Sequence, residues 1–92
     1  MHHLLLVEDN SADAALIRAM VEEIETVSQF THCQRLQEAL RYLTAEDCCL
    51  VLLDLNLPDS EGLATLNDLR SVNPRVPVVV LTGLDDQTAA LA

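Results

Sequence analysis

The chain has 92 residues, half of them hydrophobic, and fifteen acidic against five basic residues give it a formal net charge of −10. This length allows one domain at most. A charge this negative argues against binding a polyanion such as nucleic acid, and against an anionic membrane surface. The longest apolar runs, Leu4–Val7 and Val78–Leu81, are too short to span a bilayer, and Glu8 and Asp9 follow the first run too closely for a secretory signal.

The first half of the chain alternates short apolar runs with segments of helical period. Leu4–Val7 is fully apolar and ends in acids, which is typical of a strand buried on both faces. Asn10 or Ser11 can cap the next element, a helix predicted over residues 12–25. A weaker strand is expected around Ser28–His32. The two helical patterns rest on Ile17, Met20, Val21 and Ile24, and then on Leu36, Ala39, Leu40 and Leu43.

The second half shows the same alternation more clearly. Residues 49–53 are fully apolar, as a third strand would be. A loop then leads to a helix that the pair Asn73–Pro74 ends. Residues 77–81 are the most strand-like run of the chain. Asp85 or Asp86 then looks like the cap of one more helix.

The cysteines and the first histidines say little about function. Cys33, Cys48 and Cys49 show no C-x-x-C spacing, and their odd number argues against a disulfide framework. We expect three reduced, partly buried thiols in a cytoplasmic protein. His2 and His3 are expected either to lead into the first strand or to be the remnant of a tag, and neither suggests a metal site.

Strands that alternate with helices predict an α/β fold, a doubly wound parallel sheet with helices on both faces. Val78–Leu81 has the composition of an interior strand, yet nothing after it in the sequence could cover its far edge. An open apolar edge invites aggregation. Either residues are missing from this sequence or another chain completes the sheet, and we favour missing residues.

The informative polar residues stand at the carboxyl ends of the predicted strands, where ligands bind in open α/β sheets. Glu8 and Asp9 follow the first strand, Asp54 ends the third and Thr82 ends the fourth. If the first and third strands are neighbours, three carboxylates converge on one pocket. There they would raise one another's pKa unless a cation neutralised them. Oxygen ligands without His or Cys favour Mg²⁺ over zinc.

A carboxylate beside Mg²⁺ can attack phosphorus and form an acyl phosphate. The metal and nearby donors would stabilise in-line phosphoryl transfer, and the Thr82 hydroxyl and the Gly83 backbone N–H could be such donors. Taken singly, Glu8 and Asp9 could be helix-cap acids and Asp54 an ordinary strand terminator. Because acids that could form one site stand at several strand ends, the interpretation as separate structural acids is the weaker one.

Three segments resemble the response-regulator receiver domain: LLVEDN at 5–10, LLDLNLPDSEG at 52–62 and VLTG at 80–83. The motifs occur in order, and the match covers essentially the whole chain. We therefore expect residues 1–92 to be one receiver domain that is incomplete at its C-terminus. The resemblance implies a flavodoxin-like fold with sheet order 2-1-3-4-5, of which 2-1-3-4 is represented here while the fifth strand and helix are missing.

The resemblance implies that Asp54 is the phosphoacceptor, which takes a phosphoryl group from a sensor histidine kinase or a histidine phosphotransfer protein. Glu8, Asp9, Asp54 and the backbone carbonyl of Asn56 would hold Mg²⁺, with Asp9 favoured as a direct ligand and Glu8 acting through water. The Asn56 side chain would tune loss of the phosphoryl group, and Thr82 would be the switch hydroxyl. Such a domain is no enzyme beyond its own phosphorylation and dephosphorylation, and its output domain or protein is unknown.

Two other functions stay open at this point. Receiver domains carry a Lys at the end of the fifth strand, and this sequence contains no Lys. That departure favours an interaction module with a receiver-like fold that is independent of phosphorylation, whereas the intact set Glu8, Asp9, Asp54 and Thr82 argues against it. A Mg²⁺-dependent phosphohydrolase would need a second acid where Asn56 stands. No direct contact with nucleic acid or a membrane is expected, and a dimer is left open.

Overall fold

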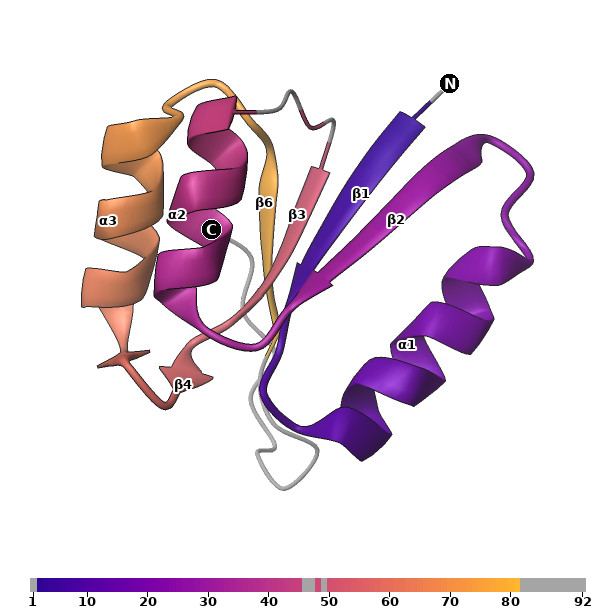
Figure 1. Cartoon of the computed structure of the whole chain (residues 1–92), viewed down its shortest axis with the longest axis horizontal. Helices are drawn as coiled ribbons and strands as arrows, with labels where there is room; N and C mark the ends of the chain where they lie inside the picture. The colour runs from indigo at the N-terminus through magenta and orange to yellow at the C-terminus, as the bar shows by residue number, and fades with distance from the viewer. Residues whose placement is uncertain (1, 46–47, 49, 82–92) are drawn as a thin grey trace.

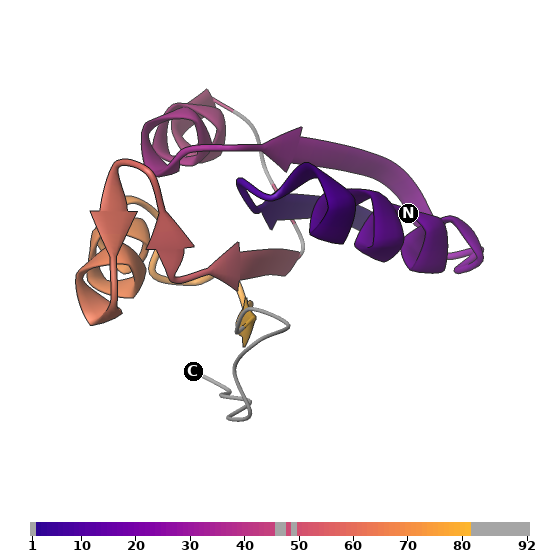
Figure 2. The same cartoon turned by 90° about the horizontal axis from the view of Figure 1, so that it is seen from below.

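The computed structural model describes residues 2–45, 48 and 50–81, which form a parallel sheet between two layers of helices (Figures 1 and 2). In chain order the elements are β1 (His2–Val7), α1 (Ser11–Glu22), β2 (Val27–Cys33), α2 (Leu36–Ala45), β3 (Leu50–Asp54), β4 (Asn56–Leu57), β5 (Ser60–Glu61), α3 (Leu63–Val72) and β6 (Val78–Leu81). The helix expected after Asp85 or Asp86 lies outside the described residues, as do Thr82 and Gly83.

The main sheet has four strands in the order β2-β1-β3-β6, and all its pairs are parallel. Because β6 is its fourth strand along the chain, the predicted α/β order 2-1-3-4 is confirmed. Leu6 lies opposite Leu52 across the β1–β3 pair, and Leu53 lies opposite Val80 across the β3–β6 pair. The apolar runs of β1 and β3 thus form the two central strands between the helix layers, whereas the run of β6 lies at the edge of the described sheet.

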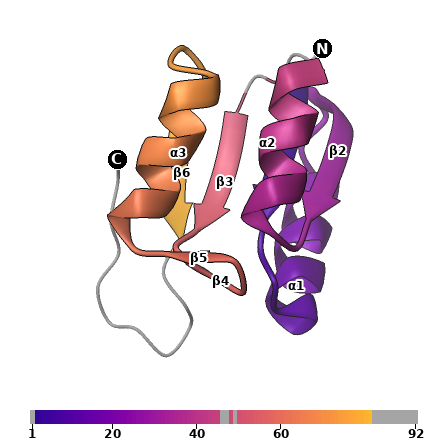
Figure 3. The same cartoon turned by 60° about the vertical axis from the view of Figure 1, so that its left-hand side comes forward.

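The side chains of β1 alternate between two apolar cores. Leu5 and Val7 pack with residues of α2 and α3, whereas Leu4 and Leu6 pack with α1. Figure 3 shows α2 and α3 on the same side of β3, and α1 lies on the opposite face. A strand with a period of two supplies both cores at once, so β1 is the central element of the fold.

The first helix is shorter and less covered than its periodicity predicted. The helix expected over 12–25 ends at Glu22. Val21 is buried and Ile17 is half-buried, but Met20 is 62% exposed. Met20 is exposed because α1 packs only against the part of the sheet that β1 and β2 form (Figure 1). Only the stripe turned toward these strands gains burial.

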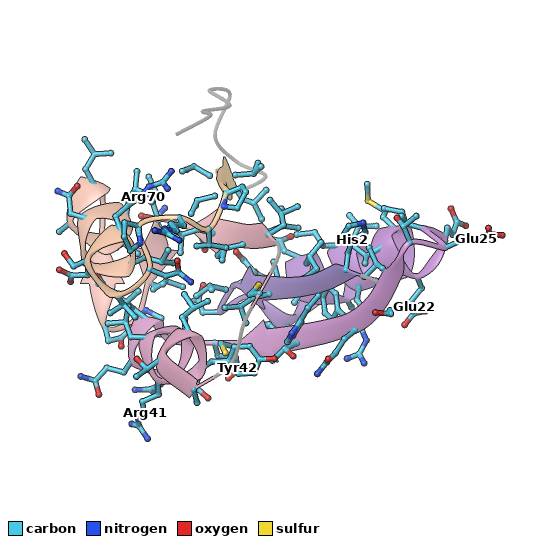
Figure 4. All side chains as sticks on the ribbon, turned by 90° about the horizontal axis from the view of Figure 1, so that it is seen from above. His2, Glu22, Glu25, Arg41, Tyr42 and Arg70 are labelled. Atoms are coloured by element: carbon cyan, nitrogen blue, oxygen red, sulfur yellow. The ribbon has the colours of Figure 1, made fainter. Side chains whose placement is uncertain are left out.

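His3 belongs to the sheet and has a structural role. Its ring contacts the Tyr42 ring edge to face, with centroids 5.2 Å apart, and hydrogen-bonds with the Tyr42 hydroxyl. Thr31 of β2 joins this cluster through its hydroxyl, 3.0 Å from Nε2 of His3. The neighbouring Arg41 projects away from the sheet (Figure 4). The cluster therefore connects the amino end of β1 to β2 and α2.

The loop expected after β3 contains a small hairpin. β4 and β5 pair antiparallel, with Asn56 opposite Glu61. Strands of two residues are too short to show an alternating pattern, so the sequence could not reveal them. Gly62 follows with a φ of 69°, which favours glycine, and its N–H donates to the Leu55 carbonyl. This turn brings the chain from the hairpin into α3.

The hairpin supplies an acidic cap to α2. Asp59 accepts hydrogen bonds from the backbone N–H groups of Leu36 (2.8 Å to Oδ1) and Gln37 (3.0 Å to Oδ2). These N–H groups belong to the first turn of the helix, where no intrahelical acceptor exists. Although partial desolvation opposes ionisation, the two N–H donors and the charge of Arg35 hold the pKa of the Asp59 carboxyl below its ordinary value.

We expect Asp59→Ala to lower the free energy of unfolding by about 1 kcal/mol at neutral pH, because two N–H groups lose their acceptor. The pKa of Asp59 is lower in the folded than in the unfolded protein. Its contribution is therefore complete above the unfolded pKa and is lost as pH falls through the folded pKa. Urea unfolding of both proteins at pH 7 and at pH 3 measures this, with the exposed Asp68→Ala as control. An equal difference at the two pH values would contradict the carboxylate cap.

Candidate functional site

Three carboxylates come together at the carboxyl ends of β1 and β3. The pair β1–β3 sets Val7 opposite Leu53, so the residues that follow, Glu8 and Asp54, are neighbours. One ligand oxygen from each of Glu8, Asp9 and Asp54 lies within 4.8 Å of the others. The structure thus brings together the three acids that the strand ends had pointed to. Figure 1 shows the strand arrows converging toward this edge of the sheet.

Two of these acids are buried. The exposed fraction of both Glu8 and Asp54 is 5%, whereas Asp9 is exposed. Burial raises the pKa of the Glu8 carboxyl to about 8, and a side-chain hydrogen bond to Asp54 and the charge of Asp54 act in the same direction. The backbone N–H of Asn10, 3.4 Å from Oε1 of Glu8, opposes this rise only in part. Negative charge is therefore unfavourable here until a cation or a proton compensates it.

The backbone just after Asp54 holds the side chain of Asp54 in one orientation. The backbone N–H of Asn56 donates to Oδ1 of Asp54 at 3.0 Å. Asn56 itself is exposed and begins β4, where it pairs with Glu61. The local turn after β3 thus sets the rotation of the carboxylate and places Asn56 beside the three acids.

The loop between β1 and α1 is anchored at both of its ends. The N–H of Glu8 donates to the carbonyl of Cys33 at 2.9 Å, and the ring of His32 lies 2.7 Å from the Glu8 carbonyl oxygen. At the other end the Asn10 side chain accepts from the N–H of Asp13 at 2.9 Å and caps α1. This settles the choice between Asn10 and Ser11 as the cap.

His32 is a site neighbour that the sequence analysis missed. Its position at the carboxyl end of the second strand, on the edge where the acids were expected, was a signal that could have found it. The contact itself depends on how β2 lies against the end of β1, and no local pattern encodes that register.

The donor set at this edge fits a hard divalent cation. Its ligand atoms are carboxylate oxygens from two buried residues and one exposed residue, and burial together with the neighbouring Asp54 raises the pKa of Glu8. Oxygen donors of this kind suit Mg²⁺ and do not suit zinc. Over residues 2–45, 48 and 50–81, no other trio of His, Cys, Asp or Glu converges in this way.

Thr82 and Gly83 lie outside the described part of the chain. Cys33 is buried and Cys48 is half-buried, which agrees with the partial burial expected for these thiols. Among the helices that the structure describes, none combines the length and the apolarity that a membrane crossing requires.

Comparison with known proteins gives a consistent family. The model of the response regulator receiver domain matches residues 4–92. The cell cycle transcriptional regulator CtrA of Caulobacter vibrioides is 36% identical over 80 residues, which are 87% of this chain and 34% of that protein. The cell cycle response regulator CtrA of Brucella abortus is 35% identical over 81 residues, again 34% of its length. The chain thus spans about a third of these curated relatives.

Two solved structures show the same fold at substantial identity. The MaeR response regulator bound to beryllium trifluoride has a TM-score of 0.83 and 30% identity, covering 94% of this chain and 70% of that one. The phosphorylated cyanobacterial phytochrome response regulator RcpA has a TM-score of 0.81 and 33% identity, covering 92% of this chain and 67% of that one.

We expect Glu8→Gln to stabilise the metal-free protein by at least about 1 kcal/mol at pH 9, because the variant removes a buried charge beside Asp54. The raised pKa means that folded Glu8 keeps its proton between pH 4.5 and about 8 while the unfolded chain loses it. Wild-type stability should therefore fall across this window, and that of Glu8→Gln should fall less.

Urea unfolding in EDTA from pH 4.5 to pH 9 measures this difference. Glu25→Gln, at an exposed position beyond the end of α1 (Figure 4), is the matched control and should leave the pH profile unchanged. An identical pH dependence of the unfolding free energy for wild type and Glu8→Gln would show that folding does not raise the pKa of Glu8.

Proposed function

The chain belongs to the response regulator receiver domain family, and from this premise we propose that it accepts a phosphoryl group on Asp54 in a two-component signalling system. The observation that carries the proposal is the placement of Asp54, buried at the end of β3 within 4.8 Å of the acids Glu8 and Asp9. The solved relatives support it, because RcpA is described in its phosphorylated form and MaeR with beryllium trifluoride bound.

The proposed step is a transfer from phosphohistidine to Asp54. A carboxylate oxygen of Asp54 attacks phosphorus and forms an O–P bond while the P–N bond of the donor breaks. The electron pair of that bond stays on the imidazole of the donor, which then takes up a proton. The N–H of Asn56 holds Oδ1 of Asp54, so the carboxylate is already oriented before the donor arrives.

Glu8, Asp9 and Asp54, with the backbone carbonyl of Asn56, would hold Mg²⁺. When bound, the ion supplies positive charge that stabilises the phosphoryl oxygens during transfer. The protein's own contribution is to keep three carboxylates close together, where their ionised forms are unfavourable. Cation binding would relieve this unfavourable charge. The exposed Asp9 is favoured as the direct ligand and the buried Glu8 as one that acts through water.

The readout and the partners follow from the family. Thr82 would be the switch hydroxyl that turns toward the phosphoryl group and shifts the population of conformations. The donor would be a sensor histidine kinase or a histidine phosphotransfer protein in the cytoplasm. The domain itself would carry out only its own phosphorylation and dephosphorylation. Residues 1–92 would belong to one receiver domain, and its output belongs to an unidentified domain or protein.

The alternative is an interaction module that keeps the receiver fold without taking phosphate. It predicts a protein that folds and binds its partner equally well with or without a phosphodonor. Labelling of Asp54 therefore decides between the two functions.

Intact mass before and after incubation with Mg²⁺ and acetyl phosphate tests the acceptor. We expect the wild-type protein to gain one phosphoryl group and Asp54→Asn to gain none, because an amide is a poor nucleophile toward phosphorus. Asp68→Asn, which removes an exposed carboxylate from α3, should be labelled like the wild type. Labelling of Asp54→Asn would exclude Asp54 as the acceptor. A wild-type protein that gains no mass would favour the interaction module.

Calorimetric titration with MgCl₂ tests the metal site separately. Asp9→Asn should weaken Mg²⁺ binding at least about tenfold, because it removes the charge and one ligand oxygen from a site of three acids. Asp68→Asn makes the same chemical change outside the site and should leave the affinity unchanged. Equal affinities of wild type and Asp9→Asn would refute the proposed ligand set.

A further inference from the structure

His32 stands at the end of β2, on the same edge of the sheet as the acidic site. It is half-buried, and its Nε2 lies 2.7 Å from the backbone carbonyl oxygen of Glu8. A carbonyl oxygen can only accept a hydrogen bond, so Nε2 must carry the proton and donate it. The imidazole of His32 therefore reaches from the edge strand to the main chain of the acid pair.

This bond completes the anchoring of the Glu8 backbone. The Glu8 N–H is already bound to the carbonyl of Cys33 at 2.9 Å, so β2 holds both polar groups of that backbone unit. The residue after Asp9 is anchored as well, because the Asn10 carbonyl accepts from the N–H of Ala14 at 2.9 Å. Asp9 thus stands between two residues whose main chains are held in place.

The Glu8 carbonyl belongs to the peptide group that joins Glu8 to Asp9. Its direction sets the plane of this peptide and hence the point from which the Asp9 side chain leaves the backbone. Because Asp9 itself is exposed, packing does little to fix its position. The hydrogen bond from His32 is therefore a main constraint on where the Asp9 carboxylate lies relative to Asp54.

Resting on the function proposed above, we propose that His32 is a positioning residue of the acidic site. Its Nε2–H fixes the Glu8–Asp9 peptide so that both carboxylates of the acid pair face Asp54. The residue acts through the main chain of Glu8 and touches neither the phosphoryl group nor the cation.

His32 also lines a recess of about 250 Å³ between α1 and β2, together with Ser11, Ala14, Ala15, Arg18, Phe30 and Gln34. The guanidinium of Arg18 lies over the Phe30 ring at 5.4 Å. The space around the imidazole leaves room for a side chain of similar length, which makes a conservative replacement practicable.

The test compares His32→Leu with His32→Gln. Leucine removes the donor, whereas the amide N–H of glutamine extends about as far from the backbone as Nε2 of histidine and can donate to the same carbonyl. We expect His32→Leu to weaken Mg²⁺ binding about tenfold, as the loss of a ligand-orienting partner does at other metal sites. His32→Gln should stay within about twofold of the wild type. His2→Leu, which removes a histidine from the opposite end of β1, should leave the affinity unchanged.

The second readout is the amide ¹⁵N resonance of Asp9, which shares a peptide group with the Glu8 carbonyl. It should shift in His32→Leu and return toward the wild-type position in His32→Gln, in the absence of Mg²⁺. A merely structural role would lower the midpoint of thermal unfolding without moving either the affinity of the folded protein or this resonance.

The outcomes separate the two proposals. If Asp9→Asn weakens Mg²⁺ binding and His32→Leu does not, the positioning role of His32 is overturned while the metal site stands. If the wild-type protein binds no Mg²⁺, the metal site of the proposed function fails and the positioning role fails with it. If glutamine does not restore what leucine removes, the donated hydrogen bond is not the cause and the proposal is again overturned.

Discussion

The parallel pairing of β1 with β3 is the interaction on which the rest of this structure depends. It aligns the two central strands of the sheet, and it ends with Glu8 and Asp54 side by side at 5% exposure each. Burial there disfavours the charged form of Glu8, and the neighbouring Asp54 adds to this effect, so the pKa of Glu8 is raised. The apolar packing of the strands must therefore provide the free energy that holds the acids together.

That packing comes from the alternation of side chains along β1. Leu5 and Val7 enter the core beneath α2 and α3, while Leu4 and Leu6 enter the core beneath α1. Each leucine buried in this way contributes roughly 1.5–3 kcal/mol relative to leaving it exposed. A slip of one residue would move each side chain of β1 to the opposite core and bring the polar Glu8 into the apolar part of the strand, so the position of Glu8 after Val7 is strongly fixed.

The loops around the site are tied to elements on either side of it. Asp59 in the hairpin after Asp54 caps α2, and the end of β2 holds the main chain of Glu8 through Cys33 and His32. The two loops that carry the acids are thus connected to β2 and α2, which follow each other in the chain. A movement of either loop would therefore strain its hydrogen bonds to β2 or α2.

The sequence by itself determined the class of the fold and the chemistry of the site. Fully apolar runs separated by helical periods predict the strands of a parallel sheet, and acids at the ends of these runs mark the ligand edge. Both inferences rest on local patterns, which one chain shows without any partner. The sequence also limited the candidates for the N-cap residue of α1 to Asn10 and Ser11, because helix capping too depends on local sequence.

Only the tertiary structure decided the features that depend on distant residues. The exposure of Met20 follows from where α1 lies on its sheet face, and the cap of α2 comes from Asp59 in a later hairpin. The bond from His32 to Glu8 depends on the register of β2 against β1. These contacts join residues more than twenty positions apart or depend on which elements are neighbours, and no local pattern can specify them because their energy arises only when the strands and helices pack.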